Sequence, residues 1–142
     1  MSRQASRWEA AVTTAVGARP GELDRRGELE SRMKAVWFGL MSEFHPPISL
    51  KEMARLAGCR AETHTTAHSA VARWKSMHWR DRYGWLILVD SFYAAAENDG
   101  EWRVSDVAEQ SVAEAFGWRR QAQDRLQAGP RAVRIRGHYD ER

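Results

Sequence analysis

The sequence predicts an all-α fold, a compact helical domain, and three features support this prediction. Apolar residues recur every three or four positions along most of the chain, which is the spacing of an amphipathic helix. Helix-capping residues such as Ser49 stand where these patterns begin, and glycines such as Gly58 stand where they end. A chain of 142 residues with 43% hydrophobic residues and seven tryptophans is also long enough to bury a core.

Two long helices are expected before the centre of the chain. The first spans about residues 6–16 and is followed by a linker, 17–21, that contains Pro20. The second spans about residues 26–44, and its apolar stripe comprises Leu29, Met33, Val36, Trp37, Leu40 and Phe44. The Pro-Pro pair at 46–47 cannot continue this helix, so a loop is expected to follow it.

Residues 48–74 predict two helices joined by a tight turn. Ser49 and Glu52 have the spacing of a capping box, in which each side chain accepts a hydrogen bond from the backbone N–H of the other. Gly58 stands where a left-handed residue ends the first helix, and Thr63 is the best N-cap for the second. The buried stripe of this second helix comprises Ala67, Ala70, Val71, Trp74 and Met77. Two helices joined by a glycine-containing turn are typical of a helix-turn-helix, whose second helix enters the major groove by its N-terminal residues.

The other face of the second helix is polar. It presents His64, Thr65, Thr66, Ser69 and Arg73. Hydroxyl and imidazole groups are costly to bury without partners, whereas they can contact base edges in a DNA groove. We therefore expect this face to be open and to contact DNA.

The same segment resembles the C-terminal DNA-binding domain of the bacterial replication initiator DnaA. That family has a Gly-Gly-Arg-Asp turn followed by His-Thr-Thr, an aliphatic residue and a small residue. Here Gly58-Cys59-Arg60 lies on the turn, and residues 64–67 read His-Thr-Thr-Ala. The resemblance covers about residues 30–76 and implies a helix-turn-helix of the DnaA and Trp-repressor type, with additional C-terminal helices.

The resemblance and the side-chain chemistry together give each candidate residue a role. Phosphate or minor-groove contacts are expected from Arg32, Lys34, Lys51 and Arg73, and from Arg60 in the turn. Base-edge contacts are expected from Thr63, His64, Thr65, Thr66 and Ser69.

Departures from the family's pattern bear on what is recognised. Two extra residues separate Arg60 from His64, Thr63 replaces the aspartate before the histidine, and Ser69 stands where the family usually has a second histidine. The DNA site is therefore expected to differ from the initiator's usual box. No P-loop or Walker B strand occurs in this sequence, so the resemblance does not imply ATP-driven assembly.

The charge is unevenly distributed along the chain, whose net charge is only +3. Residues 51–82 contain seven basic and three acidic residues, as phosphate binding requires. Residues 84–118 contain one basic and seven acidic residues. This acidic stretch would repel a DNA backbone, so it is expected to face solvent, a second subunit or a protein partner.

Further helices are expected after the central motif. The recognition helix is expected to end near Arg82, at a turn formed by Tyr83-Gly84. The segments that follow are an apolar helix at 85–97, a turn at 98–100, a helix from Ser105 to Phe116 ended by Gly117, and a last helix at 118–127 stopped by Gly129-Pro130. The tail beyond is basic and expected to be mobile.

The C-terminal half also allows a second interpretation. Residues 104–126 would form another helix-turn-helix, with Arg119, Arg120 and Arg125 on its outer face and residues 132–136 as a wing strand. We favour a helical pair that covers the core, because helix–glycine–helix patterns are common. The predicted organisation is an N-terminal helix and linker (1–24), a DnaA-like domain (25–82), a helical extension packed on it (83–128) and a basic tail (129–142).

Catalytic and metal chemistry have little support in the sequence. His64 and His68 are four residues apart, but the glutamate of a catalytic zinc helix is missing and a structural site needs two more ligands. Neither Ser69 nor Cys59 has an identifiable base, so we expect no enzyme activity, no cofactor and no metal. A single cysteine fits a reducing cytoplasm, and the longest apolar run, 85–89, is too short to span a bilayer.

The tryptophans offer one more possibility, since aromatic rings stack on unpaired bases. The helical spacing of Trp74, Trp85, Trp102 and Trp118 favours a place in the core. Trp79, between His78 and Arg80, is the tryptophan whose exposure would distinguish base stacking from a place in the core.

The sequence thus predicts a cytoplasmic, sequence-specific double-stranded-DNA-binding protein that regulates replication or transcription, of a kind that a phage or mobile element encodes. A palindromic site would require a homodimer. The alternative is a protein-interaction module that binds a replication or transcription protein through the acidic 84–118 face.

Overall fold

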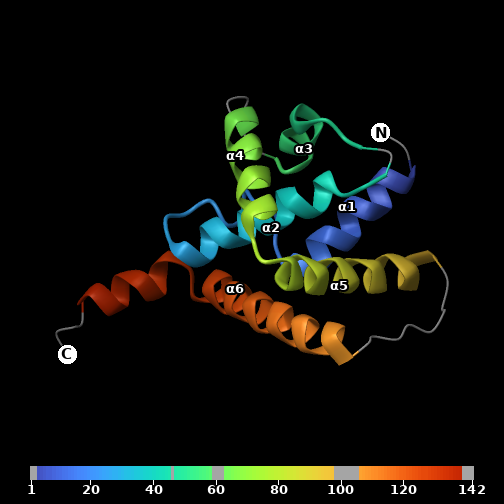
Figure 1. Ribbon diagram of the computed structural model, residues 1–142. Helices are drawn as coiled ribbons and strands as arrows, with labels where there is room; N and C mark the ends of the chain where they lie inside the picture. The colour runs from blue at the N-terminus through green and yellow to red at the C-terminus, as the bar shows by residue number, and fades with distance from the viewer. Residues whose placement is uncertain (1–2, 46, 59–62, 98–105, 139–142) are drawn as a thin grey trace.

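The computed structural model describes the backbone of residues 3–45, 47–58, 63–97 and 106–138, and the side chains of 5–45, 47–58, 66–95 and 109–127. Within these residues the chain forms six α-helices and no β-strand, which confirms the all-α prediction (Figure 1). The helices are α1 (Arg3–Val16), α2 (Glu28–Ser42), α3 (Leu50–Leu56), α4 (Thr63–Ser76), α5 (Trp79–Glu97) and α6 (Asp106–His138). None of these helices combines the length and apolar character needed to cross a membrane.

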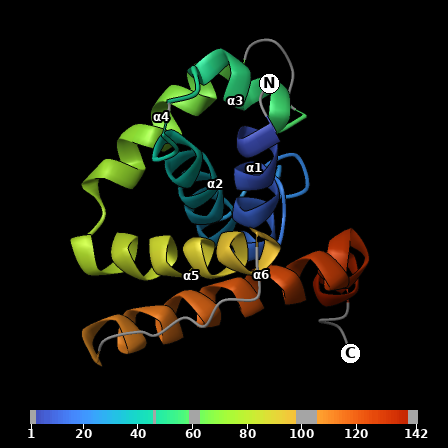
Figure 2. The same cartoon turned by 90° about the vertical axis from the view of Figure 1, so that its right-hand side faces the viewer.

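Helix α2 occupies the centre of the molecule and contacts each of the other helices of the described chain. Helix α3 lies at one end of the molecule, and α5 and α6 lie at the other (Figures 1 and 2). One hydrophobic core contains residues of all six helices, and its largest fully buried side chains include Trp37, Phe38, Trp74 and Trp85. The predicted 25–82 and 83–128 segments therefore share this core, and the boundary between them falls inside α5.

The local signals predicted around α3 are confirmed in large part. The Ser49 hydroxyl accepts a hydrogen bond from the backbone N–H of Glu52 at 3.1 Å, so it caps the helix. Gly58 has φ of 74°, the left-handed conformation expected after the helix. The Glu52 carboxylate, however, accepts hydrogen bonds from the Arg55 guanidinium at 2.6 and 3.0 Å, and this lowers the pKa of Glu52.

Two glycines allow helices to approach one another closely. A methyl group at Gly39 would lie 2.5 Å from the Cβ of Trp74 and would overlap its ring, so this glycine lets α4 lie directly on α2. A methyl group at Gly84 would lie 2.6 Å from the backbone carbonyl carbon of Ser111 on α6. The turn predicted at Tyr83-Gly84 is therefore wrong: Gly84 is a buried residue inside α5, needed for helix packing.

The predicted recognition helix is also too long, because α4 ends at Ser76 and α5 begins at Trp79. His78 lies between them, and its Nδ1 accepts a hydrogen bond from the backbone N–H of Arg80 at 3.1 Å. This side chain satisfies one of the free donors at the start of α5. Histidine is not among the preferred N-cap residues, so this break between the helices was not predicted from the sequence.

The C-terminal region is one helix, α6, and not two helices separated by Gly117. Gly129-Pro130 does not end it either, although the helix bends in its C-terminal part, as expected near proline (Figure 1). The second helix-turn-helix and the wing strand at 132–136 are therefore wrong. The predicted Ser105 cap and the 98–100 turn lie outside the described residues.

Two of the arginines predicted on an outer face are partly or largely exposed, but they also hydrogen-bond to other helices. The Arg119 Nε donates to the backbone carbonyl of Thr14 at 3.1 Å. The Arg125 guanidinium donates to the buried carboxylate of Glu30 at 3.0 Å. These bonds fasten α6 to α1 and α2, so α6 covers the core, as the favoured interpretation of this region expected.

Candidate nucleic-acid interface

Helix α4 is held firmly by its apolar face. Trp74 is fully buried over Gly39 of α2, and its indole N–H donates to the Glu43 carboxylate at 3.0 Å. Ala67 and Val71 are buried on the same face, as predicted. Because this face is fixed against α2, the opposite face of the helix is turned to solvent and has a defined orientation.

The open face of α4 contributes to a surface hollow. Thr66 and Ser69 are exposed and Arg73 is half-buried. These three side chains, with Ala70 of α4 and with Ser31 and Lys34 of α2, line a hollow of about 320 Å³. The structure thus brings together four of the residues predicted from sequence: Lys34, Thr66, Ser69 and Arg73.

Other predicted contact residues fall outside the described part of the chain. Arg60 and the side chains of Thr63, His64 and Thr65 are in this group, although the backbone places residues 63–65 in the first turn of α4. Lys51 is exposed on α3, which packs beside α4.

The two cations at the hollow have acidic neighbours on the surface. The Arg73 guanidinium pairs with the Glu28 carboxylate, and the Lys34 Nζ lies 3.7 Å from the Asp24 carboxylate. Glu28 and Asp24 are 76% and 84% exposed. Ion pairs this exposed contribute about 0–1 kcal/mol to stability, so a phosphate can replace either carboxylate at little cost.

Arg32 has a different environment from the one predicted. Its guanidinium lies 4.2 Å above the Trp118 ring of α6 and 3.5 Å from the Asp81 carboxylate of α5. The side chain is only 22% exposed. Arg32 therefore joins α2 to α5 and α6, and it is not among the residues that line the hollow.

The other flank of α4 borders a second hollow, of about 440 Å³. His68 and Lys75 of α4 face Ile48, Leu50 and Met53 across it. Across the described residues, no group of three or more His, Cys, Asp and Glu side chains is placed to hold a metal ion.

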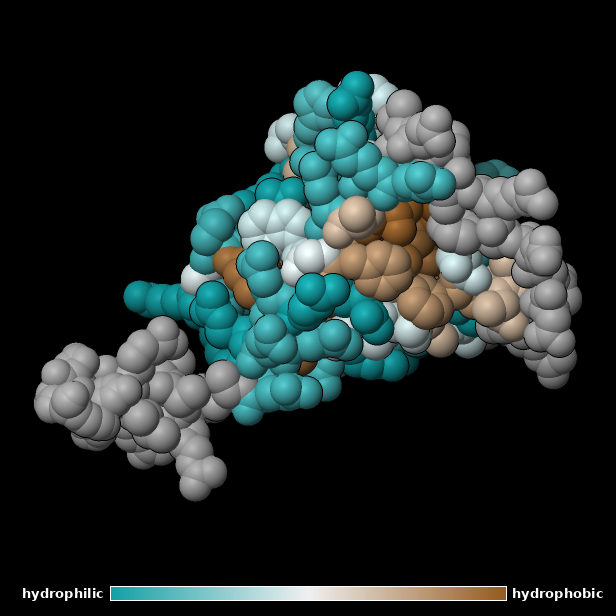
Figure 3. All heavy atoms as spheres, turned by 90° about the horizontal axis from the view of Figure 1, so that it is seen from below, coloured by the Kyte–Doolittle hydropathy of each residue, from teal (hydrophilic) through white to brown (hydrophobic). Residues whose placement is uncertain are grey.

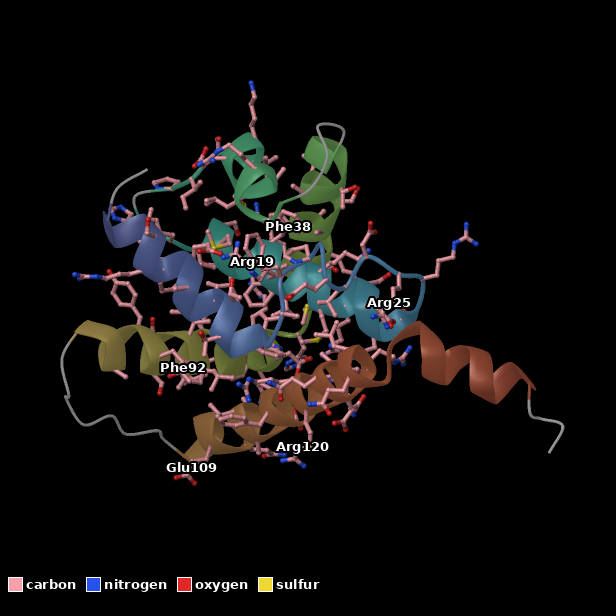
Figure 4. All side chains as sticks on the ribbon, turned by 180° about the vertical axis from the view of Figure 1, so that it is seen from behind. Arg19, Arg25, Phe38, Phe92, Glu109 and Arg120 are labelled. Carbon is pink, nitrogen blue, oxygen red and sulfur yellow. The ribbon has the colours of Figure 1, made fainter. Side chains whose placement is uncertain are left out.

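Acidic side chains are exposed on the far side of the molecule from α3. Asp90 on α5 and Glu109 and Glu114 on α6 are exposed, and Figure 4 shows Glu109 pointing away from the body of the protein. Seen from the α6 side, this surface is largely hydrophilic, and apolar side chains gather in a large patch and in smaller areas (Figure 3). Partial burial raises the pKa of Asp90, since the protein removes part of the water around its carboxylate.

Two residues at or beside the hollow were not predicted from the sequence. Ser31 and Glu28 are on α2, one lining the hollow and the other pairing with Arg73. Their positions three residues apart were visible in the sequence, but their proximity to α4 depends on how α4 packs across Gly39.

Comparison with protein-family models, with curated proteins and with solved structures finds no match to this chain. The functional argument therefore depends on its own residues and geometry.

Proposed function

We propose that the protein binds double-stranded DNA sequence-specifically and regulates replication or transcription, with the N-terminal half of α4 in the major groove. The observation that supports this most is the division of α4 into two faces. One face is locked on α2 through Trp74, and the other exposes Thr66 and Ser69 beside the cations Lys34 and Arg73. The major groove, about 12 Å wide, admits such a helix.

In this proposal the hydroxyl and imidazole side chains at the start of α4 meet the base edges: Thr63, His64, Thr65, Thr66 and Ser69. Phosphates are bound by Lys34, Lys51, Arg73 and the turn residue Arg60. Arg32 contributes indirectly, because it fixes α2 to the helices behind it.

The first test is binding to mixed-sequence duplexes over a series of salt concentrations. For each phosphate contact, log affinity is expected to fall by about 0.9 per unit of log salt concentration. Arg73→Ala should weaken binding to all sequences alike and reduce the slope by about 1. Arg120→Ala is the matched control, because Arg120 is exposed on α6 and points away from the body (Figure 4).

The exposed carboxylates of α5 and α6 favour a second candidate function, binding of a replication or transcription protein. A protein that failed to bind any duplex at low salt would contradict the DNA-binding proposal. Loss of a captured replication or transcription protein on Glu109→Lys and Glu114→Lys, together with absent DNA binding, would favour the second function.

A further inference from the structure

The corner where α4 ends and α5 begins exposes two large aromatic side chains. Trp79 is 53% exposed and Tyr83 is 42% exposed. They are four residues apart on α5 and so lie on the same face of the helix. Trp74 and Trp85, close by in sequence, are buried. Exposed aromatic rings are therefore a feature of this corner, whereas the neighbouring tryptophans are part of the core.

The exposed charged side chains of residues 75–83 are both cationic, Lys75 and Arg80. All the exposed side chains of this stretch are cationic, hydroxyl, imidazole or aromatic: Lys75, Ser76, His78, Trp79, Arg80 and Tyr83. The acidic residue of the stretch, Asp81, is half-buried and faces Arg32 at 3.5 Å. These two cations favour an anionic partner, and the two rings favour one with flat surfaces.

The Trp79 ring is held in place by its neighbours. The His78 ring stacks on it with centroids 5.8 Å apart and planes 28° apart, and His78 is itself fixed by the N–H of Arg80. The Arg80 guanidinium lies 5.4 Å from the ring centroid. Such an exposed cation–π contact is weak, so Arg80 can turn toward a phosphate while the ring stays in place.

We propose that this corner, formed by Lys75, His78, Trp79, Arg80 and Tyr83, binds single-stranded nucleic acid. Unpaired bases stack on Trp79 and Tyr83, and the phosphates between them contact Lys75 and Arg80. The stacking side chains of this site are on α5, whereas the base-reading side chains proposed for duplex DNA begin at the other end of α4, with the phosphate-binding Arg73 between them. Helix α4 has 14 residues, which places its two ends about 20 Å apart. The proposal does not depend on duplex binding.

The test compares a labelled oligothymidylate with an abasic oligonucleotide of the same length, by fluorescence anisotropy on the full chain. Both carry the same phosphates, so only stacking distinguishes them. We expect the oligothymidylate to bind about tenfold or more tightly, Trp79→Ala to reduce this difference, and Trp79→Ala with Tyr83→Ala to remove it. Trp79→Phe should keep much of it, and Arg80→Gln should weaken both ligands.

Phe116→Ala is the control, because Phe116 is also an exposed aromatic residue (39%) with an arginine near its ring, Arg119 at 6.0 Å, but it lies on α6 outside this corner. It should leave both affinities unchanged. Equal binding of the two oligonucleotides, unaffected by Trp79→Ala, would overturn the proposal. So would a polyglutamate peptide that binds as tightly as the oligothymidylate and depends equally on Trp79. Thr66→Ala with Ser69→Ala should affect only duplex binding, so either proposal can fail without the other.

Discussion

Gly39→Ala tests how α4 is positioned. The added methyl would lie 2.5 Å from the Trp74 Cβ, against an ordinary contact distance of about 3.5–4.0 Å. Trp74 cannot swing away, because it is fully buried and its N–H is bound to Glu43. Relief requires α4 to move from α2 by about 1 Å.

The cost follows from two opposing effects. Overpacking of a core costs about 1–3 kcal/mol and sometimes more, whereas alanine gains about 1 kcal/mol over glycine in a helix. Since the new methyl overlaps a ring and not a flexible chain end, we expect a net loss of about 2 kcal/mol. In a chain of this length that lowers the Tm by about 4–8 °C.

Gly117→Ala is the matched control for this measurement. Gly117 lies inside α6, and a methyl group there would meet nothing within 4 Å. Its substitution should raise the unfolding free energy by about 0.5–1 kcal/mol. Thermal unfolding followed by circular dichroism measures both variants. If Gly39→Ala proved as stable as Gly117→Ala, the described contact between α4 and α2 would be refuted.

Three further outcomes follow from individual contacts. Arg125→Ala leaves the buried Glu30 carboxylate without its cation and should lower the free energy of unfolding by about 2–4 kcal/mol. The loss should be smaller in a protein that also carries Glu30→Gln. An unchanged midpoint of denaturant unfolding would contradict the pairing. Ser49→Ala removes the α3 cap and should cost about 1 kcal/mol, so an unaltered Tm would argue against the cap. The pKa of Asp90 in the folded protein is raised above the ordinary value of 3.8. The stability that Asp90 contributes is therefore fully present below pH 3.8 and is lost as the pH rises through the pKa of the folded state. Asp90→Asn should therefore raise the Tm at pH 7, and this gain in Tm should disappear in acid. A gain in Tm that became larger in acid would contradict a raised pKa for Asp90.

The features that the sequence predicted are those that depend on neighbours in the chain. The Ser49 cap and the left-handed Gly58 involve residues within one turn of each other, so their signals are local. The same holds for the buried stripe of Ala67, Val71 and Trp74, which follows from helical period alone.

The features that it did not predict depend on contacts between distant segments. Gly84 was interpreted as a turn residue because glycine commonly is one, yet here it makes room for Ser111, 27 residues later in the chain. Arg119 and Arg125 were expected on an outer face because charged residues usually are exposed. They remain partly exposed, but they also hydrogen-bond to Thr14 and Glu30, which are far away in the sequence.

The candidate site likewise contains residues that were predicted from local pattern and residues whose surroundings depend on distant segments. Thr66 and Ser69 were predicted from helical period and are exposed as expected. Arg32 was chosen for its charge and its place in the resemblance, and neither reveals that Trp118 and Asp81 surround it. Which cations border the hollow could be learned only from the packing of α2 on α4.

The most direct measurement for the whole account is selection of binding sites from random duplexes by the unaltered protein and by Thr66→Ala with Ser69→Ala. The account predicts that the unaltered protein enriches a defined sequence and that the double variant binds duplexes with this preference flattened. Enrichment of the same sequence by both proteins, or of none by either, would contradict the claim that the open face of α4 reads DNA.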